Sequence, residues 1–400
     1  MQSTESPERT LFIALAGVLA GTGVLMVHSA SITSRPTEFE QVYLSRHLVF
    51  LGMGLVAAVV ASRVPGRVWR LFAPWLFIAT LVLLVLVLVP GIGTRVKGAQ
   101  RWFRVGPISV QPSEIAKVTL PLMTAALVFW HRARLRNWIA GVLLVAWPPV
   151  VMVPLVLLQP DLGTSLFLLL GAAIVLAVGG WPMRNFVLGA AATIPAIVYL
   201  VINKPYQLQR VTGFLSTWSD WTQAPYQLKQ SLLTLGSGGL WGVGLGKGYQ
   251  KLSFLPEANT DFVFAVVGEE LGFVGAASVL LAWAALLVCG LRLLSRLPRE
   301  SFEFHFGFAI LSQLLVQVIL NVGVVTAMVP PKGIPHPLLS YGGSHLIMTL
   351  VTLGIVLGLT RDPSTGTETE AQPKTPPIDP VAVNEPPEST EVSEREPVAA

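Results

Sequence analysis

The sequence predicts an all-α, polytopic membrane protein, and three observations support this class. Hydrophobic residues make up 52% of the chain and charged residues only 12%, whereas soluble domains are about 25% charged. Apolar runs of about 18 or more residues recur, and each can cross the roughly 30 Å hydrocarbon core as a helix. Because a bilayer offers no water to backbone amides, such runs must be helices rather than open strands.

About ten membrane-spanning helices are expected, each placed to within about four residues. The predicted spans are 11–32, 47–62, 68–90, 113–131, 138–158, 162–180, 184–203, 262–291, 305–329 and 343–360. The first run follows a single Arg and no convincing cleavage site, so it is interpreted as a permanent span rather than a signal peptide. Cys289 is the single cysteine, which excludes an intramolecular disulfide.

Three regions are expected along the chain. They are a cytoplasmic N-terminus at 1–10, a membrane domain at 11–361 and a tail at 362–400. The tail is acidic and rich in proline and lacks apolar periodicity, which predicts disorder. Arginines crowd three short loops that fall on the same side as both termini if there are ten spans. Short basic loops mark the cytoplasmic side, so both termini are predicted to be cytoplasmic.

The loop at 204–261 is far longer than a connection between two spans requires. Its aromatic side chains are suited to the membrane interface; they are Phe214, Trp218, Trp221, Tyr226, Trp241 and Tyr249. Its glycine-rich run at 236–246 allows tight bends or close approach to a ligand. A large, structured extracytoplasmic loop is therefore expected.

Ionisable residues at membrane depth are costly, so they are candidates for functional sites. Glu114 and Lys117 lie three residues apart at the start of a span, on one helix face, and can neutralise each other. Two interpretations stay open: a structural ion pair, or part of a polar cavity for a charged headgroup. Arg101 and Arg104 in the preceding loop favour the cavity, because they add positive charge on the same side.

Two aspartates stand before predicted spans. Asp161 begins a helix after Gln159-Pro160, and capping is the favoured interpretation. Asp261 lies where the long loop meets the next span. A carboxylate at a dry interface can have a raised pKa and act as a general base, but Asp is also a favoured N-cap, so both readings stay open. Glu257, four residues earlier, is the second candidate base.

Four prolines between 330 and 337 forbid a helix and favour a stiff, extended loop. Lys332 is expected to present a mobile ammonium to an anionic ligand. His336 is interpreted as an interfacial side chain rather than a metal ligand. Ser340 opens the small-residue stretch 340–344, which suits close helix packing or contact between backbone and ligand. No metal-site spacing, Walker loop or dinucleotide fingerprint is present.

Four segments, taken in order, resemble the SEDS family of lipid-linked cell-wall glycan polymerases. They are Gly98-Ala99-Gln100-Arg101-Trp102-Phe103 with Gln111-Pro112-Ser113-Glu114-Ile115-Ala116-Lys117; Gln159-Pro160-Asp161-Leu162-Gly163-Thr164; 226–272 with its Leu255-Pro256-Glu257-Ala258-Asn259-Thr260-Asp261-Phe262; and Lys332-Gly333-Ile334-Pro335 with Ser340-Tyr341-Gly342-Gly343-Ser344. The similarity covers roughly residues 10–361 and is greater to the FtsW and SpoVE branch than to RodA. Departures occur at Asn259, His336, Leu338 and His345, and they bear on lipid or partner contacts rather than on the catalytic assignment.

The resemblance implies a peptidoglycan glycosyltransferase that polymerises lipid II on the outer face of the bacterial cytoplasmic membrane, in septal synthesis during cell division. The acceptor GlcNAc 4-hydroxyl would attack C1 of the donor MurNAc with inversion, and undecaprenyl pyrophosphate would leave. Asp261 would be the catalytic base. Arg101, Lys117 and Lys332 would hold the pyrophosphate, and Glu114 would orient Lys117. The implied substrate-binding set is Arg101, Gln111, Glu114, Lys117, Glu257, Lys332 and Ser340.

The resemblance also implies partners. They are lipid II, a single-span class B penicillin-binding protein transpeptidase, other divisome proteins and membrane lipid, with no nucleic acid. No cofactor is specified, although a divalent cation, Mg or Mn, is compatible with a pyrophosphate leaving group. Two alternative functions stay open: a lipid II flippase or other transporter, since proline-broken segments and buried charges also mark transporters, and a non-catalytic division scaffold.

Overall fold

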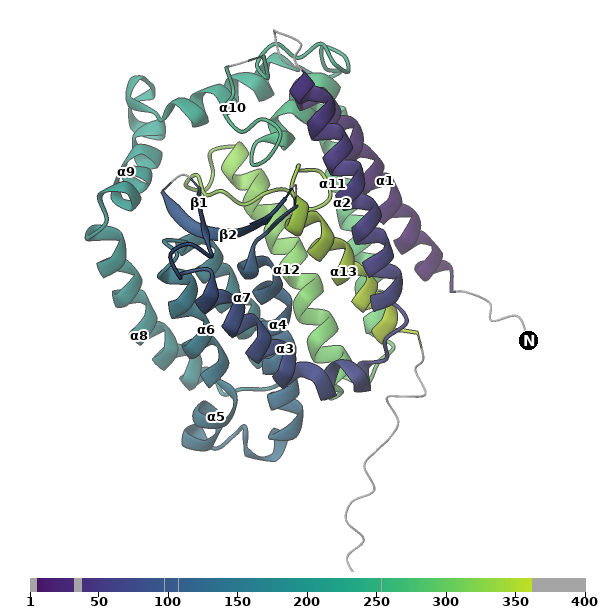
Figure 1. Ribbon diagram of the computed structural model, residues 1–400, viewed down its shortest axis with the longest axis vertical. Coiled ribbons are helices and arrows are strands. Elements are labelled where there is room, and N and C mark those ends of the chain that lie inside the picture. Colours follow the sequence, from purple (N-terminus) through teal and green to yellow (C-terminus); the bar gives the residue numbers. More distant parts are fainter. Residues whose placement is uncertain (1–5, 32–37, 97, 107, 253, 362–400) are drawn as a thin grey trace, which may run out of the picture.

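The computed structural model describes residues 6–31, 38–96, 98–106, 108–252 and 254–361. The predicted disordered tail at 362–400 therefore lies outside the described residues. The described chain is a bundle of helices with a small sheet at one end (Figure 1).

The helices are α1 (Pro7–Ser31), α2 (Glu38–Ala61), α3 (Gly66–Leu86), α4 (Pro112–Trp130), α5 (Trp138–Val145), α6 (Trp147–Leu157), α7 (Leu162–Val178), α8 (Met183–Ile202), α9 (Pro205–Ser219), α10 (Tyr226–Ser237), α11 (Val263–Leu294), α12 (Phe302–Val325) and α13 (Gly343–Leu359).

The helices confirm the predicted polytopic, all-α class. Among the described residues, α1, most of α2, α3, α4, α8, α11 and α12 are long and apolar enough to cross a membrane, and α6, α7 and α13 are shorter apolar helices. Each predicted span coincides with one helix except two. Span 138–158 is broken at Ala146 into α5 and α6, and span 262–291 lies on α11, which is kinked at the non-helical Gly272. Pro148 and Pro149 explain the break at Ala146, because proline cannot donate the backbone hydrogen bonds that a continuous helix needs there.

Both ends of the membrane domain lie at one end of the bundle. Arg9 donates a hydrogen bond of 3.1 Å to the carbonyl of Leu357, which joins the start of α1 to the end of α13. Arg296, in the turn after α11, pairs with Glu8 at 2.8 Å. These contacts agree with an even number of crossings. The assignment of this end to the cytoplasm stays a prediction.

The opposite end carries the two long connections. A three-stranded antiparallel sheet is formed by β1 (Thr94–Val96), β2 (Ala99–Val105) and β3 (Ile108–Val110), in that order. The sequence did not predict the sheet, and β1 and β3, with three residues each, are too short to leave a periodicity. The loop 204–261 is structured, as expected, since it contains α9, the 3₁₀ helix η2 (Trp221–Gln223) and α10.

Helix α4 lies at the centre of the bundle. In the apolar stretch of α4, 78% of the residues are buried inside the protein, whereas only 6% are buried in that of α8. Helix α8 stands at the periphery of the bundle beside α9 (Figure 1). Helix α4 contacts α3, α7, α12 and α13, while α2 packs along α13 and α1 along α11. A charged residue at the start of α4 is therefore enclosed by protein rather than by lipid.

A glycine permits the close crossing of α13 and α2. A Cβ added to Gly354 in α13 would lie 2.3 Å from the carbonyl oxygen of Ala58 in α2. Gly189 in α8 has open space instead. We expect Gly354→Ala to lower the thermal stability of the purified protein by about 1–3 kcal/mol, because overpacking displaces the two helices. Gly189→Ala is the matched control and should be neutral or stabilising, since alanine favours helix. Equal melting temperatures for the two variants would contradict this packing.

Candidate active site

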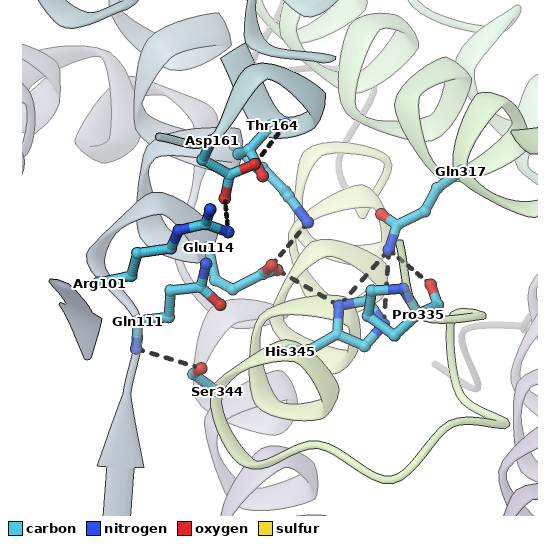
Figure 2. A network of polar contacts seen from close by, with 10 residues as sticks. Arg101, Gln111, Glu114, Asp161, Thr164, Gln317, Pro335, Ser344 and His345 are labelled. Carbon is cyan, nitrogen blue, oxygen red and sulfur yellow. Dashed lines mark hydrogen bonds and ion pairs between the residues drawn. The ribbon is translucent and has the colours of Figure 1, made fainter. Parts of the chain in front are cut away.

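The predicted ion pair at the start of α4 is present. Pro112 occupies the first turn, where its missing N–H costs nothing, and places Glu114 and Lys117 one turn apart. The Lys117 ammonium lies 2.7 Å from Glu114 Oε1. His345, from the first turn of α13, lies with Nδ1 3.3 Å from Glu114 Oε2 (Figure 2). The carboxylate is thus held between two groups, of which the sequence predicted only the lysine.

A glutamine extends this network to the proline-rich loop. Gln317 of α12 donates from Nε2 to the carbonyl of Pro335 at 3.0 Å, and the same nitrogen lies 3.5 Å from the His345 ring nitrogens (Figure 2). A small cavity opens beside the network, between α4, α7, α12 and α13, and Phe167 and Gln313 line its other walls. The ion pair therefore borders a small cavity with largely apolar walls, and both readings of the pair, structural or part of a headgroup site, stay predictions.

Asp161 caps α7, as predicted. Its Oδ1 accepts a hydrogen bond of 3.1 Å from the backbone amide of Thr164. Its Oδ2 lies 3.2 Å from Arg101 of β2, a partner that the sequence did not predict (Figure 2). Arg101 also donates to the carbonyls of Gln159 at 2.8 Å and Pro160 at 2.7 Å. The guanidinium therefore anchors the sheet to the start of α7.

Lys332 lies beside the same carboxylate. Its side chain passes Gly163, where an added Cβ would lie 3.7 Å from the lysine Cδ. Burial lowers the pKa of the Lys332 ammonium, and the negative charge of Asp161 opposes part of that shift. The expected mobile ammonium thus belongs to a partly buried side chain that lies against Gly163 in the first turn of α7. Arg101 and Lys332 together place two positive charges around Asp161.

Asp261 stands directly before Phe262, the N-cap residue of α11, whose own side chain makes no capping hydrogen bond. The two readings of Asp261, capping residue and general base, both stay predictions. A Cβ added to Gly333 would lie 3.1 Å from Asp261 Oδ2. Asn321 of α12 donates from Nδ2 to the carbonyls of Asp261 at 2.8 Å and Ile334 at 2.9 Å. The carboxylate therefore faces the Lys332-Gly333 segment, and one amide holds both segments.

Ser340 supports this arrangement from within the protein. Its buried hydroxyl donates to the carbonyl of Thr260 at 2.6 Å and accepts from the backbone amide of His336 at 2.7 Å. Because its single O–H donates to Thr260, Ser340 holds the loop that carries Asp261. Glu257, with φ of +59°, accepts at Oε2 a hydrogen bond of 2.9 Å from Thr260. The predicted substrate contacts of Ser340 and Glu257 stay predictions.

Two other sequence expectations have different outcomes. The backbone amide of Gln111 donates to Ser344 Oγ at 3.3 Å, which joins the starts of α4 and α13 (Figure 2), and its substrate contact stays a prediction. His336 is fully buried rather than interfacial, so that expectation was wrong. Its ring stacks on Phe264 at 5.7 Å, and burial lowers its pKa to about 4. A neutral imidazole packs well against an aromatic ring, which explains its burial.

The end of the glycine-rich run and the residues just after it bind carboxylates of the chain itself. Glu269 Oε1 accepts from the amides of Tyr249 at 2.9 Å and Gln250 at 3.2 Å. Glu270 Oε2 accepts from the amide of Gly246 at 3.0 Å, and its Oε1 pairs with Lys251 at 2.6 Å. The side chains of the Lys251–Glu270 pair are fully buried. The run thus wraps the start of α11, a role that glycine density alone did not reveal.

Within the described residues, no group of three or more His, Cys, Asp or Glu side chains could hold a metal ion. The residues present therefore specify no ligand set for the divalent cation that the resemblance allows.

The model of the FtsW, RodA and SpoVE family, described as cell cycle protein, matches residues 9–364. The chain belongs to this family. It is 38% identical over 344 residues to the probable peptidoglycan glycosyltransferase FtsW of Coxiella burnetii, covering 85% of this chain and 92% of that protein. It is 33% identical over 363 residues to stage V sporulation protein E of Bacillus subtilis, covering 90% and 99%.

Solved structures of the FtsW, RodA and SpoVE family have the same fold. A chain from a peptidoglycan synthase complex, studied for its structural coordination of polymerization and crosslinking, matches with a TM-score of 0.72 and 33% identity over 88% of this chain and 97% of that one. The rod shape determining protein RodA of Thermus thermophilus matches with a TM-score of 0.65 and 34% identity over 88% and 96%. The family resemblance predicted from four segments is confirmed.

The buried charges of this family member should be coupled energetically. Lys117→Met leaves Glu114 with one partner at a buried position, and breaking a buried pair costs about 3–5 kcal/mol. Glu114→Gln combined with Lys117→Met removes both charges. We therefore expect the double variant to melt at a higher temperature than Lys117→Met in the same detergent. A double variant that is less stable than either single variant would refute the ion pair.

Proposed function

We propose that this chain is a peptidoglycan glycosyltransferase that polymerises lipid II into glycan strands for septal cell-wall synthesis during cell division. The names of its FtsW relatives support the reaction class. The observation that carries the proposal is the position of Asp261. Its carboxylate faces a stiff loop at the end of the bundle that carries the sheet, and Lys332 stands on that loop next to Gly333.

The proposed reaction assigns one proton acceptor. The 4-hydroxyl of the acceptor GlcNAc attacks C1 of the donor MurNAc and gives its proton to Asp261. The new C–O bond forms as the bond from C1 to the pyrophosphate oxygen breaks, and that oxygen leaves with the electron pair. A single in-line displacement inverts the anomeric centre. Asp261 suits this role because Asn321 and Ser340 hold its backbone in place, and positioning is a large part of general-base catalysis.

The cationic side chains suit the leaving group. Negative charge grows on the pyrophosphate as the bond breaks, and preorganised positive charge stabilises that transition state. Lys117 and Lys332 lie at the start of α4 and beside the start of α7, within the same end of the bundle. In this proposal Lys117 and Lys332 contact the pyrophosphate, and Glu114 orients Lys117. Arg101 acts mainly by anchoring the segment 159–161, since its Nε, Nη1 and Nη2 groups donate to Gln159, Asp161 and Pro160.

The membrane side follows from the substrate. We place the end with the sheet, α9 and α10 on the outer face of the cytoplasmic membrane, and both termini in the cytoplasm. The basic short loops at the other end support this orientation. A class B penicillin-binding protein is the proposed partner, since a matching chain comes from a complex that coordinates polymerization and crosslinking. Other divisome proteins would recruit the pair to the septum.

Asp261→Asn is the direct test of the base. The amide keeps the shape of the side chain but cannot accept the proton, so polymer formed from lipid II should fall about 10²–10⁴-fold. The assay uses the purified full-length chain, with and without a cognate transpeptidase, and reads glycan strands on a gel. Asp220→Asn, in the same outer loop, is the matched control and should stay near wild type. A folded Asp261→Asn protein with wild-type polymerisation would eliminate the assignment, and Glu257→Gln would then be examined.

Lys332 should make the reaction sensitive to alkaline pH. Because burial lowers the pKa of its ammonium, raising the pH neutralises Lys332 earlier than an exposed lysine, and the leaving group then loses one positive charge. Arginine stays protonated over the whole range. Lys332→Arg should therefore keep its relative polymerisation rate at higher pH than the wild type does. If the polymerisation rates of the two proteins fall in the same way at alkaline pH, Lys332 is excluded as the group that titrates.

A further inference from the structure

Glu114 has a partner on a second helix. His345 stands at the third residue of α13, and its Nδ1 approaches the Glu114 oxygen that Lys117 does not contact. Glu114 and His345 are each 5% exposed, so bulk solvent screens their contact little. Because a carboxylate only accepts hydrogen bonds, Nδ1 must carry the hydrogen. Gln317 Nε2 lies 3.5 Å from each of the two ring nitrogens of His345.

This arrangement resolves a conflict at Lys117. In the proposed function, the Lys117 ammonium both neutralises Glu114 and contacts the pyrophosphate of the substrate. If Lys117 were the only partner, turning toward the substrate would leave a buried carboxylate uncompensated, which is strongly unfavourable. A second donor on α13 keeps Glu114 hydrogen-bonded while the lysine moves. The groups facing His345 are Glu114 and Lys117 from α4 and Gln317 from α12.

We propose that His345 is a positioning residue that holds Glu114 through its Nδ1–H, so that Lys117 is released to bind the pyrophosphate of lipid II. The proposal rests on the proposed function and adds a residue to it. His345 acts through Glu114 and does not itself contact the substrate. The same contact also joins the first turn of α13 to α4, next to the Gln111–Ser344 hydrogen bond.

The test uses two substitutions that differ in one property. His345→Leu fills a similar volume but cannot donate a hydrogen bond. His345→Asn places an amide near the position of Nδ1 and keeps a donor. His305→Asn is the matched control, because His305 is also a buried histidine but lies near the opposite end of α12 from Gln317 and Asn321. Each full-length protein is purified, its melting temperature is recorded, and lipid II binding and polymerisation are measured.

We expect His345→Leu to raise the Kd and KM for lipid II about tenfold, the equivalent of one lost charge-assisted hydrogen bond, with a smaller change in kcat. His345→Asn and His305→Asn should stay within about threefold of wild type. In a Glu114→Gln background, His345→Leu should have little further effect, because the partner through which it acts has lost its charge.

Three results would overturn the proposal: unchanged binding in a folded His345→Leu protein, failure of His345→Asn to restore binding, or full additivity with Glu114→Gln. If His345→Leu does not fold, lipid II binding by His345→Asn decides the matter, and tenfold weaker binding contradicts the donor role. If the wild type binds lipid II but makes no polymer, the proposed function fails, while the lipid II binding measurements on the variants still test the role of His345.

Discussion

A carboxylate enclosed at membrane depth constrains the helices that surround it. Glu114 sits in the first turn of α4, the central helix, where an uncompensated charge would cost several kcal/mol. Its two oxygens are matched by Lys117 from its own helix and His345 from α13. Gln317 then links the histidine to the proline-rich loop. The start of α13, the middle of α12 and the start of α4 must therefore converge at one point.

The candidate catalytic aspartate depends on a second set of contacts, made to backbone rather than to side chains. Asn321 donates to the carbonyls of Asp261 and Ile334, and Ser340 donates to the carbonyl of Thr260. Four prolines stiffen the loop that receives these bonds. A general base needs its carboxylate in a defined place more than it needs an unusual environment. With its backbone anchored in this way, the Asp261 carboxylate lies against Gly333.

The outer loop is ordered by charge buried against it. The Glu270 and Glu269 carboxylates accept hydrogen bonds from the amides of Gly246 and Tyr249, and Lys251 neutralises Glu270. Ser29 of α1 joins this group through its hydroxyl, 2.6 Å from Glu270. The amides approach the carboxylates closely, as glycine permits. The segment that leads from α10 to Asp261 is thereby fixed to α1 and α11, which makes a long loop a stable support for the site.

The sequence alone determined the features that depend on neighbours three or four residues apart. Apolar runs set the spans, the spacing of Glu114 and Lys117 placed them on one helix face, and Asp161 capped α7. The sequence also identified the family, because the motifs and their order can be recognised without knowledge of the fold.

Only the tertiary structure decided the partners that the chain brings from afar. His345 meets Glu114 across 231 positions, and Arg101 meets Asp161 across 60. The burial of His336 was likewise set by the packing around it. A local pattern fixes which helix face a side chain occupies. It does not state which other helix will lie against that face, because that contact depends on the path of the whole chain.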